Sequence, residues 1–246
     1  ARLATDPHSG FAPDMREAAI VACARWETTR QRHLKPQIKE FWSYDPEVAH
    51  TLFSTASEQQ ARVWKTLTTV LRETGATVLF LWGCRAVKDI SALADLGLVT
   101  LNLGVTGVTD LGPLCGLSDL RWLNLTSTGI TDINPLQGLS KLEVLYLGGT
   151  GVTDIGPLGG LSKLVTLNLS GTGVTDLDSL GGLSKLKRLD LGGTDVTDLG
   201  PLGGLSKLER LDLRGTGVTD LRPLVGLSNL WMLDLGGTGV PDLRPM

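Results

Sequence analysis

One set of residues in this 246-residue sequence has a type and spacing that could do chemistry. An aspartate recurs every 22 residues, at Asp110, Asp132, Asp154, Asp176, Asp198, Asp220 and Asp242. A column of carboxylates could bind calcium. Unit charges about 4.8 Å apart repel by only about 1 kcal/mol in water, and hydrogen bonds that cap a turn offset this repulsion. We therefore expect these aspartates to cap turns and not to bind metal.

Glycine-rich strings are a second candidate for chemistry. The string from Gly171 through Gly173 to Asp176 begins like a dinucleotide-binding fingerprint. Its third glycine is replaced by aspartate, and near copies recur along the chain, so we interpret it as part of a scaffold. No Gly-Lys-Ser/Thr phosphate-binding loop is present. We expect no cofactor.

Histidine and cysteine nucleophiles are not supported either. The histidines lie outside the recurring strings and near no serine or cysteine that we can place, at His8, His33 and His50. The cysteines are too far apart for a C-x-x-C metal site, at Cys23, Cys84 and Cys115. The sequence therefore predicts a protein that is not an enzyme.

An internal repeat of 22 residues positions these side chains. Pairs of the form Leu-x-Leu recur at this step: Leu79/Leu81, Leu101/Leu103, Leu123/Leu125, Leu145/Leu147, Leu167/Leu169, Leu189/Leu191, Leu211/Leu213 and Leu233/Leu235. The apolar spacing changes along each unit, from two at Leu145 and Leu147 to three at Ile155, Leu158 and Leu161. A spacing of two predicts a strand, and a spacing of three predicts a short 3₁₀ or irregular turn.

A single unit buries too few apolar side chains to offset the entropy lost on ordering 22 residues, so neighbouring units must stack. We therefore predict an α/β fold: a solenoid of eight parallel strands over residues 76–246, with the last repeat truncated at Met246.

The unit Leu142-x-x-Leu145-x-Leu147-x-x-Thr150 resembles the pattern L-x-x-L-x-L-x-x-N/C of leucine-rich repeats. Its short form, with T-D-L-x-P-L on the back, is similar to that of bacterial internalins and of the leucine-rich-repeat regulatory subunit of protein phosphatase 1. The string T-G-V-T-D-L is similar to that of trypanosomatid leucine-rich-repeat proteins. The resemblance covers about residues 76–246 and implies a curved solenoid whose concave parallel sheet recognises a protein.

The sequence departs from this family at the position usually held by asparagine. Threonine occupies it at Thr106, Thr128, Thr150, Thr172, Thr194, Thr216 and Thr238, and Cys84 opens the column. A hydroxyl has one donor where an amide has two, so each side chain can bond fewer backbone groups. We expect a slightly looser turn in the same fold.

The segment before the repeats carries helix signals. Only two of the 31 glycines, Gly10 and Gly75, precede residue 76. We predict an N-terminal helical capping region over residues 1–75, with helices that begin near Pro13 and Asp45 and a last helix from about Ser57 to Thr74. These helices would cover the apolar end of the first repeat.

The C-terminal end has no predicted cover. Residues 242–246 enter a back turn and stop, and Pro241 replaces the threonine found at Thr219 and Thr197. We expect that the natural chain continues beyond Met246, or that another copy covers this end. The uncapped end could therefore contact a partner.

The outward rows of the predicted sheet vary, because the core does not constrain them. One row reads Phe80, Asn102, Asn124, Tyr146, Asn168, Asp190, Asp212 and Asp234. The row two residues earlier reads Val78, Thr100, Trp122, Val144, Thr166, Arg188, Arg210 and Met232. Neighbouring glycine pairs, such as Gly148 and Gly149, favour a shallow site over a small-molecule pocket.

We predict that a protein partner binds this concave face. Aromatic side chains lie towards the N-terminal strands, and charged ones lie towards the C-terminal strands. The predicted binding residues are Phe80, Trp82, Trp122, Tyr146, Arg188, Asp190, Arg210, Asp212, Arg214, Trp231, Met232 and Asp234. Two other interpretations remain: Arg and Asp on adjacent strands neutralise one another as a lattice, and Trp82 packs under the helical cap.

Composition excludes several classes of protein. The formal net charge is −3, which does not favour a nucleic-acid partner bound by excess positive charge. No apolar run approaches the ~20 residues that span a bilayer, and sparse cysteines fit a reducing, cytoplasmic location. We interpret two basic sets as solvated surface: Arg25, Arg30, Arg32, Lys35 and Lys39 before the repeats, and Lys163, Lys185 and Lys207 on the turns.

The sequence therefore favours a non-enzymatic interaction module or scaffold that binds a protein. One alternative, implied by the resemblance, is a regulatory or targeting subunit of an enzyme such as a phosphatase. Another is the recognition half of a longer enzyme or surface protein.

Overall fold

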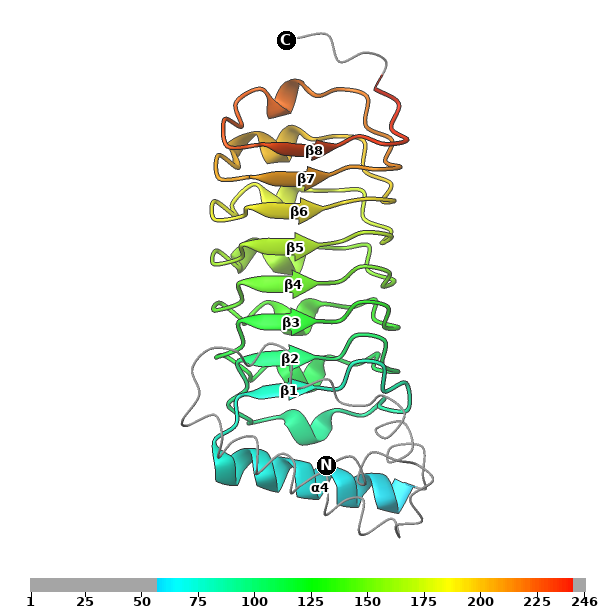
Figure 1. The fold of residues 1–246 in the computed structure, drawn as a ribbon, viewed down its shortest axis with the longest axis vertical. Helices are drawn as coiled ribbons and strands as arrows, with labels where there is room; N and C mark the ends of the chain where they lie inside the picture. The colour runs from blue at the N-terminus through cyan, green and yellow to red at the C-terminus, as the bar shows by residue number, and fades with distance from the viewer. Residues whose placement is uncertain (1–56, 241–246) are drawn as a thin grey trace.

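The computed structural model describes residues 57–240, which form one helix followed by a stack of repeats (Figure 1). All eight strands form one open sheet in chain order. They are β1 (Val78–Phe80), β2 (Thr100–Asn102), β3 (Trp122–Asn124), β4 (Val144–Tyr146), β5 (Thr166–Asn168), β6 (Arg188–Asp190), β7 (Arg210–Asp212) and β8 (Met232–Asp234). The predicted solenoid of eight strands is confirmed. The sheet is open, with β1 and β8 at its two edges.

The strands pair in parallel at a register step of 22 residues. Leu145 of β4, for example, lies between Leu123 of β3 and Leu167 of β5. The middle residue of β1–β7 is buried, and the residues on either side of it lie on the opposite face. The middle leucines thus face the core, and the two outward rows share a solvent-facing surface.

The back of each repeat is a 3₁₀ turn, and an aspartate two residues before it binds the first N–H of the turn. The turns are η2 (Ser91–Leu93), η3 (Gly112–Leu114), η4 (Asn134–Leu136), η5 (Gly156–Gly160), η6 (Asp178–Leu180), η7 (Gly200–Gly204) and η8 (Arg222–Leu224). Asp154 Oδ1 accepts a hydrogen bond of 2.8 Å from the Gly156 N–H. The same bond forms at Asp89, Asp110, Asp132, Asp176, Asp198 and Asp220. The capping role predicted for this column is confirmed, and Asp242 lies outside the described residues.

The threonine column closes the turn after each strand. Thr150 Oγ1 donates to the Leu147 carbonyl at 2.6 Å, and the Thr150 N–H donates to the same oxygen at 3.2 Å. Equivalent hydroxyl bonds form at Thr106, Thr128, Thr172, Thr194, Thr216 and Thr238. Each bond stays within its own repeat. Cys84 opens the column, and burial raises the pKa of its thiol to about 12.

The residue before each threonine has a positive φ, a conformation that favours glycine. Gly149 and Gly171 have φ of 66° and 62°. Two repeats place a side chain there instead, at Val105 (φ 59°) and Ser127 (φ 54°). Both interruptions directly follow β2 and β3.

Helix α4 (Ser57–Thr74) packs against the first repeats. Val63, Trp64 and Leu71 are buried in the same apolar cluster as the leucines of the sheet and turns. Gly75 ends the helix as predicted, because the N–H groups of residues 75 and 76 donate to the Arg72 and Leu71 carbonyls. Figure 1 shows α4 next to β1 and η2 at one end of the stack. The capping role of residues 1–75 stays a prediction, and the helices expected near Pro13 and Asp45 lie outside the described residues.

The last described repeat is more exposed than the others. Val225, Trp231, Met232 and Leu233 are exposed apolar residues, whereas the middle leucines of β1–β7 are buried. Residues 241–246, which carry the predicted uncapped end, lie outside the described residues. A contact at this end stays a prediction.

Candidate functional site

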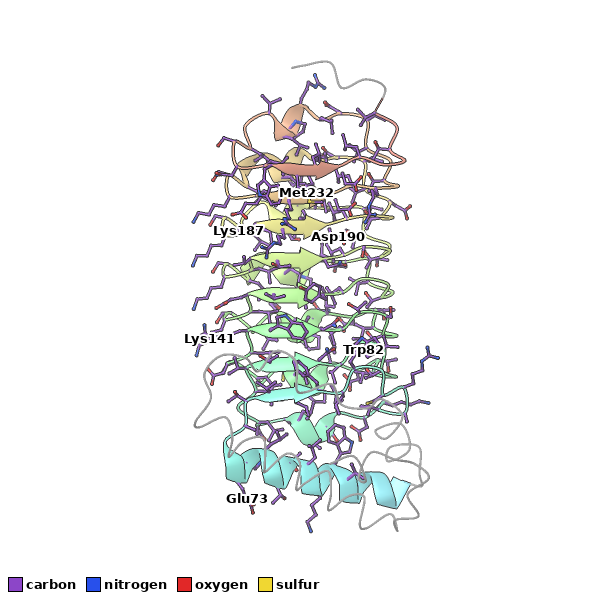
Figure 2. All side chains as sticks on the ribbon, in the orientation of Figure 1. Glu73, Trp82, Lys141, Lys187, Asp190 and Met232 are labelled. Atoms are coloured by element: carbon purple, nitrogen blue, oxygen red, sulfur yellow. The ribbon has the colours of Figure 1, made fainter. Side chains whose placement is uncertain are left out.

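We use the name sheet face for the solvent-facing side of β1–β8, including its flanking residues Trp82, Arg214 and Trp231. Figure 2 shows its side chains along the whole stack, with Asp190 and Met232 labelled near the C-terminal strands. Every residue predicted to bind a partner lies on this surface or at its border. Whether they bind a partner stays a prediction.

An aromatic cluster of Phe80, Trp122 and Tyr146 lies across β1–β4. The Phe80 and Trp122 rings meet edge to face, with centroids 6.1 Å apart. Trp122 and Tyr146 make a second such contact at 5.7 Å. All three residues are half-buried, so each ring is held by its neighbour and still reaches solvent. The predicted aromatic region is therefore a connected surface at these three residues.

Trp82 lies apart from this cluster. Its side chain is half exposed, and within residues 57–240 it has no ring contact with the other aromatic residues. A Cβ at Gly104 would lie 2.9 Å from Trp82 Cδ1, so the indole covers this glycine. The prediction that Trp82 joins the other aromatic residues in one region is therefore wrong in part, because Trp82 does not contact them.

The acidic residues of the sheet face form hydrogen bonds with the backbone of their own chain. One carboxylate oxygen of Asp190, Asp212 and Asp234 accepts a hydrogen bond from the N–H two residues later, at 3.0 Å in each case. Asn102, Asn124 and Asn168 make the same turn in their repeats. These side chains thus shape the end of each strand, a role that the sequence analysis missed. Its signal was the recurrence of Asn or Asp at the third strand position.

The second oxygens of these carboxylates are also engaged. Asn168 Nδ2 donates to Asp190 Oδ2 at 2.7 Å, and the Arg214 guanidinium binds Asp212 at 2.6 Å and Asp234 at 3.4 Å. Burial raises the pKa of Asp190, and the charge of nearby Asp212 adds to the rise. Burial alone would raise the pKa of Asp212 too, but the hydrogen bonds and charge of Arg214 lower it.

Arg188 and Arg210 lie side by side on β6 and β7 and bind no carboxylate within residues 57–240. Both are exposed. The Arg210 guanidinium lies 4.4 Å from the centre of the Trp231 ring, a cation–π contact that orients it. The interpretation that Arg and Asp on adjacent strands neutralise one another is thus wrong for Arg188 and Arg210. Among the sheet-face arginines within residues 57–240, Arg214 alone pairs with aspartates.

Ion pairs link other repeats at the N-terminal side of the strands. Arg121 pairs with Glu143 at 3.0 Å, Lys141 with Asp119 at 2.6 Å and Lys187 with Glu209 at 2.6 Å. The hydrogen bond from Lys187 lowers the pKa of Glu209, and the charges of Lys187, Arg188 and Arg210 also lower it. Opposite charges 22 residues apart were the sequence signal for these pairs, and the sequence analysis missed it.

Smaller side chains lie between Trp122 and Arg188 in the row that holds both residues. The two intervening residues are Val144 and Thr166. The other outward row carries Tyr146 and Asn168 on the same two strands. The small side chains are therefore confined to one row of the sheet face.

Within residues 57–240, no group of three or more His, Cys, Asp or Glu side chains could hold a metal ion. No helix in this range is both long and apolar enough to cross a membrane.

The repeats match a known sequence family. The family model for leucine rich repeats (2 copies) matches residues 118–160, 140–182, 162–204 and 184–226. Residues 118–226 of this chain are leucine-rich repeats. No curated protein sequence matches it.

Solved leucine-rich repeat structures agree with this assignment. An internalin (inlF) from Listeria monocytogenes is 30% identical with a TM-score of 0.65, and the match covers 71% of this chain and 52% of that one. An internalin C2 from the same organism is 28% identical with a TM-score of 0.66, covering 81% and 86%. A plant peptide hormone receptor, RGFR1, solved in complex with RGF2, shares the fold at 20% identity and a TM-score of 0.55, covering 62% and 27%. The leucine-rich repeat chain thus spans about half the length of the first internalin.

Proposed function

We propose that this leucine-rich repeat protein is a non-enzymatic interaction module that binds a protein partner on its sheet face. The aromatic cluster carries the proposal. Phe80, Trp122 and Tyr146 form a connected, half-exposed aromatic surface on a sheet whose other outward positions are mostly small or polar. Aromatic side chains and arginines contribute most of the binding energy at protein interfaces, and Arg188 and Arg210 lie on the same face.

The fold is also suited to this role. A plant peptide hormone receptor of the same fold, RGFR1, is in complex with RGF2. In this chain, the buried columns maintain the stack, so outward side chains can change from repeat to repeat without loss of packing.

Affinity capture from a native extract tests the proposal, with the complete chain as bait. The test variants are Trp122→Ala and Arg210→Glu, which change the two ends of the surface. Ile155→Val is the stability control, because it removes one methyl group from a buried position far from the sheet face and costs about 0.5–1.5 kcal/mol. We expect a partner that wild type and Ile155→Val retain and that Trp122→Ala and Arg210→Glu lose. A partner retained equally by all four baits would contradict the proposal.

The regulatory alternative is tested with the same material. Phosphatase activity that co-purifies with wild type and is lost with Trp122→Ala would identify the module as a targeting subunit. Capture of a partner without phosphatase activity would favour the scaffold role.

A further inference from the structure

We infer that the partner presents an extended acidic segment that crosses the strands, with an aromatic or apolar residue on Trp122 and carboxylates on Arg188 and Arg210. The inference rests on the proposed function and names the chemistry of the partner at the same surface. Its basis is a difference between the cations and the anions of the sheet face.

The anions are already bonded within the chain. Asp190, Asp212 and Asp234 cap their own strand ends, and their second oxygens contact Asn168 or Arg214. Glu209, the carboxylate next to the two arginines, is held by Lys187. A cationic partner would compete with these bonds.

Two arginines of the sheet face, in contrast, have donors to offer. Arg188 and Arg210 are adjacent in register, and neither binds a carboxylate anywhere in residues 57–240. Two guanidinium groups on strands about 4.8 Å apart repel each other, and carboxylates that bind both relieve this repulsion. Guanidinium is also the cation whose planar donors best match a carboxylate.

Lysines on the preceding turns add to this positive field. Lys163, Lys185 and Lys207 are exposed and precede β5, β6 and β7, and no ion pair within residues 57–240 includes them. From the sequence, these lysines were predicted to be solvated surface. Together with the arginines, they make the N-terminal side of these strands the positive side of the sheet face, so an acidic segment is steered there.

The row that contains Trp122 gives the length of the segment. Its members on β3 to β7 are Trp122, Val144, Thr166, Arg188 and Arg210, in consecutive register. Three strand spacings separate β3 from β6, about 14 Å in all, which an extended chain covers in about four residues. The small residues between leave room for a backbone to pass.

Synthetic peptides test this geometry against the complete chain. The probe is acetyl-Trp-Gly-Ser-Gly-Glu-Glu-Glu-amide. A peptide of the same composition, acetyl-Trp-Glu-Glu-Glu-Gly-Ser-Gly-amide, has the wrong spacing, and a third peptide replaces each Glu with Gln. At low ionic strength, we expect the probe to bind about tenfold more tightly than either control peptide, as measured by calorimetry.

Matched protein variants test the residues. Arg188→Gln/Arg210→Gln should reduce probe binding to that of the Gln peptide. Arg72→Gln/Arg222→Gln removes the same charge from exposed sites on α4 and η8 and should bind the probe like wild type. Equal binding of the three peptides, or full binding by the Arg188→Gln/Arg210→Gln protein, would overturn the inference.

The two proposals fail separately. A captured partner that depends on Trp122 while the peptides show no preference would overturn the acidic segment alone. Capture that is unaffected by Trp122→Ala would overturn the proposed function and, with it, this inference.

Discussion

The buried columns and the sheet face obey different rules, although they alternate along the same strands. The middle strand residue is leucine in all eight strands, from Leu79 to Leu233, while the residue before it varies among Val, Thr, Trp, Arg and Met. Close packing of stacked repeats permits little change in the columns. The outward rows do not have this constraint, so their side chains are available for recognition.

The largest difference between the two regions should appear on truncation of a buried leucine. Leu145→Ala removes a side chain with no exposed surface and should lower the free energy of unfolding by about 2–5 kcal/mol. Arg188→Gln on the sheet face should change it by about 0.5 kcal/mol or less. Urea unfolding measures both values. Similar losses for the two variants would contradict the division.

Substitutions in the positive-φ column should have the next largest effect on stability. Gly171 has φ of 62°, and a Cβ there would approach no atom more closely than 3.9 Å, so Gly171→Ala tests conformation without a clash. It should cost about 1–2 kcal/mol. The reverse change, Val105→Gly, should stabilise the protein by up to about 1 kcal/mol, because glycine's own entropy cost offsets part of the relief. Loss of stability in Val105→Gly by thermal unfolding would show that this residue is not strained.

The threonine column should contribute a smaller amount. Thr150→Val keeps the shape and removes the buried hydroxyl that donates to Leu147, which should cost about 1 kcal/mol. Thr153→Val is the control, because its side chain is exposed and donates no hydrogen bond within residues 57–240. If both variants unfold at the same urea concentration, the hydroxyl bond contributes nothing.

The smallest expected effect is the contribution of Asp220 to the pH dependence of stability. The hydrogen bond from Arg222 lowers the pKa of Asp220 to about 2, below the ordinary value near 4. A lowered pKa means that this carboxylate contributes stability above about pH 4 and loses it as the pH falls towards 2. Asp220→Asn retains an oxygen for the capping bond and removes the charge. Its melting temperature should therefore lie slightly below that of wild type at pH 5 and equal it near pH 2.

Periodicity explains why so much of the fold could be predicted from the sequence. The strands, the 3₁₀ turns and the capping aspartates repeat every 22 residues, so one physical argument applies to every unit. Helix α4 was predicted because Gly75 is a clear end signal.

The contacts on the sheet face were predicted less completely. The position of a residue in the repeat does not show which neighbouring group its side chain binds. The rows were placed correctly, but Asp190 could bond to its own turn, to Asn168 or to an arginine, and its place in the row does not choose among them. Arg210 likewise lies on Trp231, where the sequence suggested an aspartate. Long flexible side chains have several partners within reach, and only the structure shows which ones they meet.

One measurement tests most directly whether the sheet face serves recognition and the columns serve stability. The dissociation constant of the captured partner is measured for wild type, Trp122→Ala and Ile155→Val, with the melting temperature of each variant. We expect Trp122→Ala to weaken binding by about tenfold or more, as interface aromatic residues do, while Ile155→Val lowers the melting temperature and leaves binding unchanged. If binding follows the melting temperature in both variants, the sheet face has no separate role and this division is wrong.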